Sequence, residues 1–153
     1  MPSSLFQTGT VRAMPSRTRY TGRTMRTAIV TTATGKFRQT VRIGPHTLTA
    51  DESVAEGGED AGPAPHEWLL AGLGACTAIT LQMYAERKGW KLSKVSVTVT
   101  GEHAEGAFVM HRELALEGDL DDEKRARLKE IAEKCPVHKT LTGAVRIETT
   151  LKT

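Results

Sequence analysis

One long run without charge dominates the sequence: the eighteen residues between Glu67 and Glu86 read WLLAGLGACTAITLQMYA. Its length approaches the ~20 apolar residues that a membrane-spanning helix needs. The run nevertheless contains Thr77, Thr80 and Gln82 and several small residues, so its total hydrophobicity is modest. In a soluble protein, a helix that is apolar on all sides lies inside the core. We therefore predict a buried central helix and no membrane partner.

The ends of this helix are marked by local signals. Pro65 suits the first helical turn, where its fixed φ is favourable and its missing N–H costs nothing. Glu67 places a negative charge in that turn, and Arg87 places a positive charge in the last one, so both complement the helix dipole. Gly89 is a typical residue for ending a helix. The pattern predicts a helix over 65–88, roughly 36 Å long.

Most of the remaining chain shows the alternation and turn residues of strands. The valines of SKVSVTVTGE, for example, fall on every second residue, which predicts one inward face. A second helix is expected over 122–134, capped by an aspartate. The expected strands are 27–34, 36–43, 46–50, 93–102, 107–117 and 144–151. The order β-β-β-α-β-β-α-β, with long helices beside hairpins, indicates an α+β fold.

The composition, with 39% hydrophobic and 25% charged residues, is typical of a soluble globular protein. The net charge of +3 is unevenly distributed, because residues 1–26 carry five arginines and no acid, and their +5 leaves −2 for the rest. We expect 1–25 to be a flexible basic tail and 26–153 to be one domain. The tail is similar to an organelle transit peptide, or it is a simple extension. Only Tyr20 interleaves its arginines, so no nucleic-acid partner is predicted.

Two cysteines, Cys76 in the central helix and Cys135 at the end of the second helix, are the main candidates for chemistry. Free cysteine often packs as a small buried hydrophobe, which gives a purely structural interpretation. The small residues around Cys76 would also let a substrate approach its sulfur, and both interpretations remain open. His66 and His138 could complete a zinc site, but no CxxC or HxxxH spacing organises these residues. We predict no metal and no bound cofactor.

Two segments resemble motifs of a known family. Residues 65–78, PHEWLLAGLGACTA, resemble the central-helix motif of the OsmC/Ohr family, the osmotically inducible and organic-hydroperoxide-resistance proteins. Residues 135–141, CPVHKTL, resemble the second motif of that family. The resemblance covers about 26–153. It implies an OsmC-like fold, in which strands wrap around long central helices in an intertwined homodimer.

The resemblance also implies a thiol-dependent peroxidase that reduces organic hydroperoxides. Cys76 would be oxidised to a sulfenic acid, and Cys135 would resolve it as a Cys76–Cys135 disulfide. An external dithiol, of the lipoyl type or a small thiol, would then reduce this disulfide by exchange. A transient catalytic disulfide is compatible with the reducing cytoplasm, which is the expected location.

In the hydroperoxide branch of the family, an arginine held by a glutamate stabilises the reactive thiolate. The glutamate lies ten residues before the cysteine, a position that His66 occupies here, with Glu67 one place later. One residue turns a helical side chain by about 100°, so His66 and Glu67 remain alternatives. Arg38 and Arg42 share a strand face and are the candidate arginines, with Arg38 preferred. The predicted catalytic residues are Cys76, Cys135, Arg38 and Glu67.

A different class of function remains open beside the peroxidase. The chain could be a non-enzymatic dimeric protein that binds a small apolar ligand and whose cysteines are structural. The two hypotheses differ in one observable property, because only the enzyme requires a reversible Cys76–Cys135 disulfide.

Overall fold

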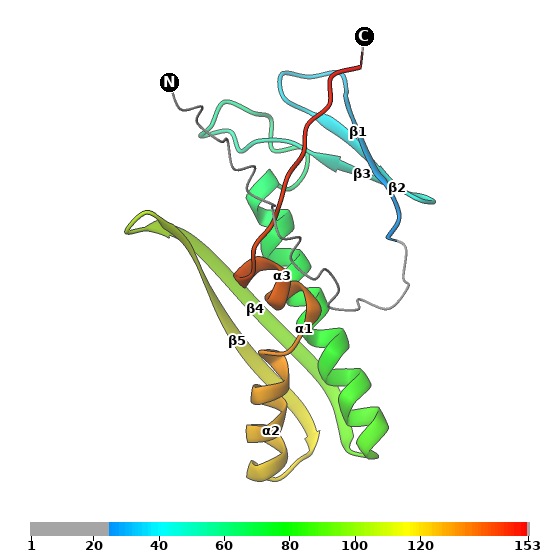
Figure 1. Ribbon diagram of the computed structural model, residues 1–153, viewed down its shortest axis with the longest axis vertical. Helices are drawn as coiled ribbons and strands as arrows, with labels where there is room; N and C mark the ends of the chain where they lie inside the picture. The colour runs from blue at the N-terminus through cyan, green and yellow to red at the C-terminus, as the bar shows by residue number, and fades with distance from the viewer. Residues whose placement is uncertain (1–24, 153) are drawn as a thin grey trace, which may run out of the picture.

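The computed structural model describes residues 25–152 and shows an α+β architecture. A long helix packs on an antiparallel hairpin, and a three-stranded antiparallel sheet lies near the start of that helix (Figure 1). The elements in chain order are β1 (Ala28–Thr32), β2 (Gln39–Ile43), β3 (His46–Ala50), α1 (Pro65–Lys88), β4 (Lys91–Ala104), β5 (Ala107–Asp119), α2 (Asp122–Ala132) and α3 (Pro136–Thr142). The predicted fold class is confirmed. The predicted basic tail falls almost wholly on residues outside the described range, so it stays a prediction.

Helix α1 begins and ends at the predicted residues. At its start, the Glu67 carboxylate accepts a hydrogen bond from the backbone N–H of Ala64 at 2.8 Å, which satisfies a donor that has no partner inside the helix. At its end, Gly89 adopts the left-handed conformation with φ of 67° and donates its N–H to the last carbonyls. A residue without a Cβ meets little steric cost in that conformation. Both boundaries are therefore determined by neighbouring residues.

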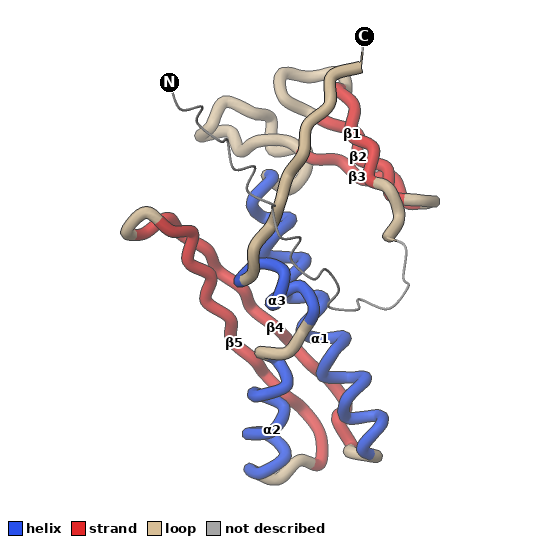
Figure 2. Tube along the Cα trace, viewed as in Figure 1, coloured by secondary structure: helices blue, strands red, loops and turns tan. Residues whose placement is uncertain are grey.

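The two sheets differ in their contact with α1, because the hairpin packs along the helix and the three-stranded sheet lies near its start. Strands β1, β2 and β3 form an antiparallel meander, and β4 and β5 form a long hairpin (Figure 2). Strand β4 packs along α1 and turns Val95, Val97 and Val99 toward the interior, as the alternation predicts. The hairpin thus forms one wall along the length of α1.

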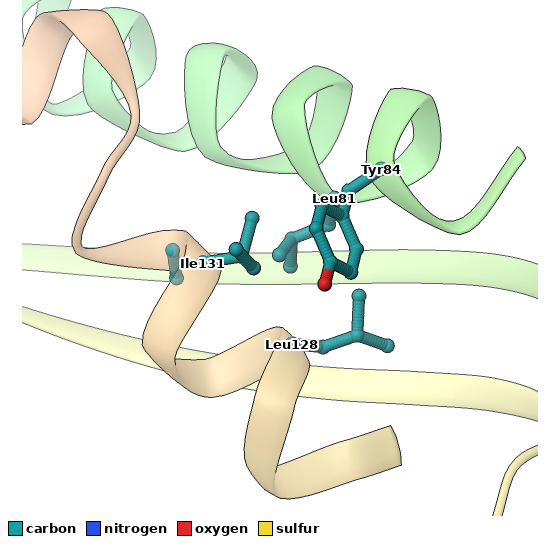
Figure 3. Packing of buried hydrophobic residues seen from close by; sticks show 5 residues of the cluster. Leu81, Tyr84, Leu128 and Ile131 are labelled. Atoms are coloured by element: carbon teal, nitrogen blue, oxygen red, sulfur yellow. The ribbon is translucent and has the colours of Figure 1, made fainter. Parts of the chain in front are cut away.

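The core lies between α1, α2 and the base of the hairpin. It is built by Leu81 and Tyr84 of α1 with Leu128, Ile131 and Ala132 of α2 (Figure 3). Half-buried strand residues such as Val95 and Leu114 complete it. Leu81 and Leu128 are fully buried, so this cluster anchors α2 on α1.

The prediction that α1 is buried is correct for one face of the helix only. The buried positions Leu73, Thr77 and Leu81 recur every four residues and form a single stripe. On the opposite side, Ile79 and Met83 are 55% and 64% exposed. By length and composition alone α1 would also suit a membrane span, but its buried stripe belongs to the core described above. One chain therefore covers only part of this apolar helix.

The predicted strand over 144–151 is wrong for the single chain. Residues 144–150 have no regular secondary structure, and Val145, Ile147 and Leu151 are 61%, 84% and 87% exposed. The alternation that predicted a strand is present, but a strand also requires a hydrogen-bonded neighbour. Within residues 25–152 no strand pairs with this segment.

The second predicted helix, 122–134, corresponds to α2, and a further helix that was not predicted, α3, follows it. Helix α2 ends at Ala132, and α3 begins at Pro136 after a short turn. Proline cannot donate the hydrogen bond that a continuing helix needs, so it breaks α2. The same residue is favourable in a first turn, so it also starts α3. The break leaves Cys135 directly before a helix.

Candidate thiol site

Cys76 and Cys135 lie side by side where α3 packs on the middle of α1. Both are free thiols, and the Cys135 side chain contacts Cys76 closely enough to act on its ionisation. Cys135 is the capping residue of α3, and its Sγ accepts the backbone N–H of His138 at 3.3 Å. The structure therefore brings together the two cysteines that the sequence predicts as a pair, although fifty-eight residues separate them.

The two sulfur atoms differ in their accessibility. Cys135 is fully buried, whereas Cys76 is partly exposed. Burial raises the pKa of the Cys76 thiol, and the neighbouring Cys135 side chain raises it further. Hydrogen bonds from the Val137 backbone and the Thr80 side chain act in the opposite direction without cancelling the increase. Cys76 is thus the sulfur that solvent reaches, and its surroundings favour the protonated form.

Arg112 of β5 is a residue of this site that the sequence analysis missed. Its Nη1 donates to Thr77 Oγ1 at 3.0 Å and to the Ala132 carbonyl at 3.1 Å, and its Nη2 binds Glu133 Oε1 at 2.8 Å. Thr77 Oγ1 in turn lies 3.7 Å from Cys135 Sγ. Arg112 therefore places a buried cation, 10% exposed, one side chain away from the second sulfur.

A signal for Arg112 is present in the sequence. Along β5 the inward positions are Met110, Arg112, Leu114 and Leu116, and the residues between them are exposed. A single arginine in an otherwise apolar inward stripe marks a buried charge, and buried charges are rarely left unpaired. The periodicity of this strand would have identified Arg112 if it had been applied to charged as well as apolar residues.

The other predicted site residues have different neighbours in the single chain. Arg38 forms an ion pair with Glu59 at 3.2 Å, and its Nε is buried without a hydrogen-bond partner. Glu67 caps α1, as described above. His66 packs against the rings of His103 and Phe108 at centroid distances of 5.5 and 5.1 Å. None of these contacts involves a cysteine, so the assignment of Arg38 and Glu67 to the site stays a prediction.

A cavity of about 630 Å³ lies beside two neighbours of the thiols, Thr80 and Pro136, and neither cysteine lines it. Thr80 interacts with Cys76, and Pro136 follows Cys135. Apolar walls come from Met83, Tyr84 and Ile131, and charged groups from Glu86, Arg87 and Lys134. Pockets of this size commonly hold small organic molecules. Among residues 25–152, no three His, Cys, Asp or Glu side chains gather as a metal ion would require.

Several solved structures share this fold. An OsmC-like protein from Mycoplasma pneumoniae is 20% identical, with a TM-score of 0.66 over 78% of this chain and 89% of that one. The organic hydroperoxide resistance protein OsmC from Legionella pneumophila is 22% identical, with a TM-score of 0.59 over 79% and 93%. The organic hydroperoxide resistance protein OhrB of Bacillus subtilis is 25% identical, with a TM-score of 0.53 over 76% and 91%.

A search of curated proteins finds no match to the chain. A comparison with protein families gives a specific result, because residues 57–150 match the family described as OsmC-like protein. The matched range contains α1, the β4–β5 hairpin, α3 and both cysteines. The sequence motifs, the fold and the family match agree, and the chain belongs to the OsmC-like protein family.

Proposed function

We propose that the protein is a thiol-dependent peroxidase that reduces organic hydroperoxides through Cys76 and Cys135. The observation that carries this proposal is the meeting of the two thiols at the α1–α3 junction, with one sulfur accessible and the other buried. A peroxide reaches the accessible sulfur first, and the buried sulfur stands beside it as the second reactant. The pair therefore has the asymmetry that a two-cysteine redox cycle needs.

In the first step, the Cys76 thiolate attacks the terminal oxygen of the hydroperoxide. An S–O bond forms, the O–O bond breaks, and the alkoxide leaves and takes up a proton to become the alcohol. In the second step, the Cys135 sulfur attacks the sulfur of the Cys76 sulfenic acid. The S–S bond forms, the S–O bond breaks, and water leaves.

An external dithiol completes the cycle by thiol–disulfide exchange. Its thiolate attacks Cys76, because this sulfur is partly exposed and Cys135 is not. Cys135 then leaves as the thiolate, and the second thiol of the reductant releases Cys76. The reductant is oxidised to its own disulfide, so the protein needs no bound cofactor for electron balance.

The cavity beside the thiols supports an organic substrate. Its walls include Met83, Tyr84 and Ile131, and an alkyl or aryl group buried there gains roughly 25 cal/mol per Å² of apolar surface removed from water. Hydrogen peroxide gains nothing comparable. Two structural neighbours are described as organic hydroperoxide resistance proteins, which supports the same substrate class.

The proposal includes a homodimer. Ile79 and Met83 leave one side of α1 exposed. Among residues 25–152, edge strand β1 has no partner on one side, and the segment after α3 has none on either side. A second copy supplies apolar surface and strands of the matching kind. The same association would offer a second route by which Arg38 or Glu67 reaches a thiol, since neither contacts a cysteine within one chain.

The test is consumption of cumene hydroperoxide with dihydrolipoamide as reductant. We expect the wild type to turn over, Cys76→Ser to be inactive, and Cys135→Ser to accumulate a sulfenic acid that dimedone traps. Equal rates for the wild type and Cys76→Ser would contradict the proposal. No turnover by the wild type, with the hydroperoxide bound but intact, would favour the ligand-binding protein with structural cysteines.

A further inference from the structure

Thr77 is an unusual residue in the buried stripe of α1 because it is polar and fully buried. In the described chain, 25–152, the other buried polar side chain is Asp51, whose oxygens accept three backbone N–H groups of its own loop. Thr77 instead connects different elements. Its Oγ1 lies 2.8 Å from the Leu73 carbonyl, 3.0 Å from Arg112 Nη1 and 3.7 Å from Cys135 Sγ.

The bonding directions around Thr77 follow from the chemistry of its neighbours. A guanidinium can only donate, so Arg112 occupies an acceptor site of the threonine oxygen. The hydroxyl has a single proton, which it can give to the Leu73 carbonyl or to Cys135 Sγ. The bond to Leu73 is ordinary for threonine in a helix. The bond from the charged Arg112 to the same oxygen is unusual, and it makes the Thr77 hydroxyl a better donor to an electron-rich sulfur.

Arg112 is itself held in place by other bonds. Glu133 and the Ala132 carbonyl bind it from the end of α2, so β5, α1 and α2 meet at one guanidinium. On the other side of the sulfur, the His138 N–H donates to Cys135 Sγ at 3.3 Å. The His138 N–H thus holds the second sulfur beside Cys76, and the Thr77 hydroxyl becomes a second donor when its proton turns from the Leu73 carbonyl to Cys135 Sγ.

We propose that Arg112, acting through Thr77, is a positioning residue that orients Cys135 for its attack on oxidised Cys76. This inference rests on the proposed peroxidase function and adds to it the residues that set the speed of the second step. In that step the Cys135 thiol forms the S–S bond, the S–O bond of the sulfenic acid breaks, and the departing hydroxide takes the thiol proton as water. Arg112 and Thr77 remain chemically unchanged.

The experiment separates the two steps. Rapid-quench mass spectrometry after one equivalent of cumene hydroperoxide follows the sulfenic acid and the disulfide as functions of time. The ratio of the disulfide rate to the sulfenic-acid rate should fall roughly tenfold in Thr77→Val, which removes the hydroxyl but keeps the shape. Arg112→Met should have a similar effect. With excess hydroperoxide, both variants should accumulate Cys76 sulfinic acid, and Thr77→Ser should restore the wild-type ratio.

Arg125→Met is the matched control. Arg125 is also half-buried, and it donates to the carbonyls of Leu116 at 2.8 Å and Leu120 at 3.2 Å, with no contact to either thiol. It should lower stability but leave the ratio of the two rates unchanged. Because Arg112→Met removes several bonds, Arg112→Lys provides a second variant, which keeps the charge and should give an intermediate ratio.

Each outcome has a defined meaning. A wild-type ratio in Thr77→Val or Arg112→Met, or an equal decrease in Arg125→Met, would overturn the positioning role while leaving the peroxidase intact. Absence of any sulfenic acid or disulfide in the wild type would overturn the proposed function and the inference together. The two failures are thus distinguishable in one data set.

Discussion

The half of the molecule built from α1, the β4–β5 hairpin and α2 encloses its own core, whereas the half built from β1, β2, β3 and the segment after α3 is open. In the first half, Leu81 and Leu128 are fully buried. In the second, every residue of β1 is exposed, and so are the apolar side chains near the C-terminus. Residues 25–152 therefore enclose a core in one half only. The thiol site lies next to the enclosed core, where α3 packs on α1.

The largest effect is expected from the closed core. Leu81→Ala should lower the free energy of unfolding by about 2–5 kcal/mol, because it removes a fully buried side chain and leaves a cavity. Ile29→Ala, in exposed strand β1, should cost less than about 1 kcal/mol at low protein concentration. Urea denaturation of both variants measures the difference. Equal costs at low concentration would remove the distinction between the two halves.

The second prediction concerns the exposed face of α1. Met83→Glu should weaken self-association by roughly a hundredfold or more, because an unpaired carboxylate would be buried between two copies. Lys129→Glu, at an exposed position on α2, is the control and should leave association unchanged. Sedimentation equilibrium measures the masses. A Met83→Glu protein that still associates like the wild type would show that a second copy does not cover this face.

A smaller effect is expected from the titration of Cys76. Because burial raises its pKa, the alkylation rate of this thiol should rise with pH to a midpoint above the ordinary thiol value. Cys135→Ala should lower the midpoint, since the neighbouring side chain contributes to the increase, but burial should keep it above the ordinary value. Iodoacetamide kinetics measure both. A wild-type midpoint below the ordinary value would show that an additional cation, with Arg38 as the candidate, acts on the thiol.

The same shift has a consequence for stability. The folded protein holds the Cys76 proton more tightly than the unfolded chain does. Its contribution to stability is therefore complete below the ordinary thiol pKa and is lost as the pH rises through the raised pKa of the folded state. Cys76→Ser should lack this alkaline decrease in the unfolding midpoint. An identical pH dependence in the two proteins would contradict the shift.

The smallest effect is expected from an exposed ion pair of the hairpin, between Lys94 and Glu117. Lys94 binds Glu117 at 3.1 Å, but both side chains are more than half exposed, so water screens the attraction. Lys94→Ala should change the free energy of unfolding by less than about 0.5 kcal/mol. If urea denaturation shows a large decrease in the free energy of unfolding, the outer face of the hairpin is covered in solution.

Local patterns predicted those parts of the fold that depend on neighbouring residues. The bounds of α1 follow from Pro65, Glu67 and Gly89, and each acts within one turn of the helix. The prediction of a strand over 144–151 was wrong because alternation does not show whether a neighbouring strand is present to pair with it. Helix α3 was missed because Cys135 was placed at the end of one helix, and Pro136 was not considered as the start of another.

The candidate site was predictable only in part. The pairing of Cys76 with Cys135 came from a resemblance to a family, because residues so far apart give no local sign of contact. Arg112 was missed because the alternation of its strand was considered for apolar residues only. Arg38 and Glu67 were named from the family pattern, and within one chain they bind Glu59 and the start of α1. Sites assembled from several elements require the tertiary structure.

The central claim is that Cys76 and Cys135 act as one redox pair. Peptide mass spectrometry after one equivalent of cumene hydroperoxide tests it most directly. We expect a protein that has lost two hydrogen atoms, a cross-linked peptide pair that contains both cysteines, and full recovery of the thiols with a dithiol. Two unmodified thiols, or an oxidised Cys76 beside a Cys135 that never reacts, would contradict it.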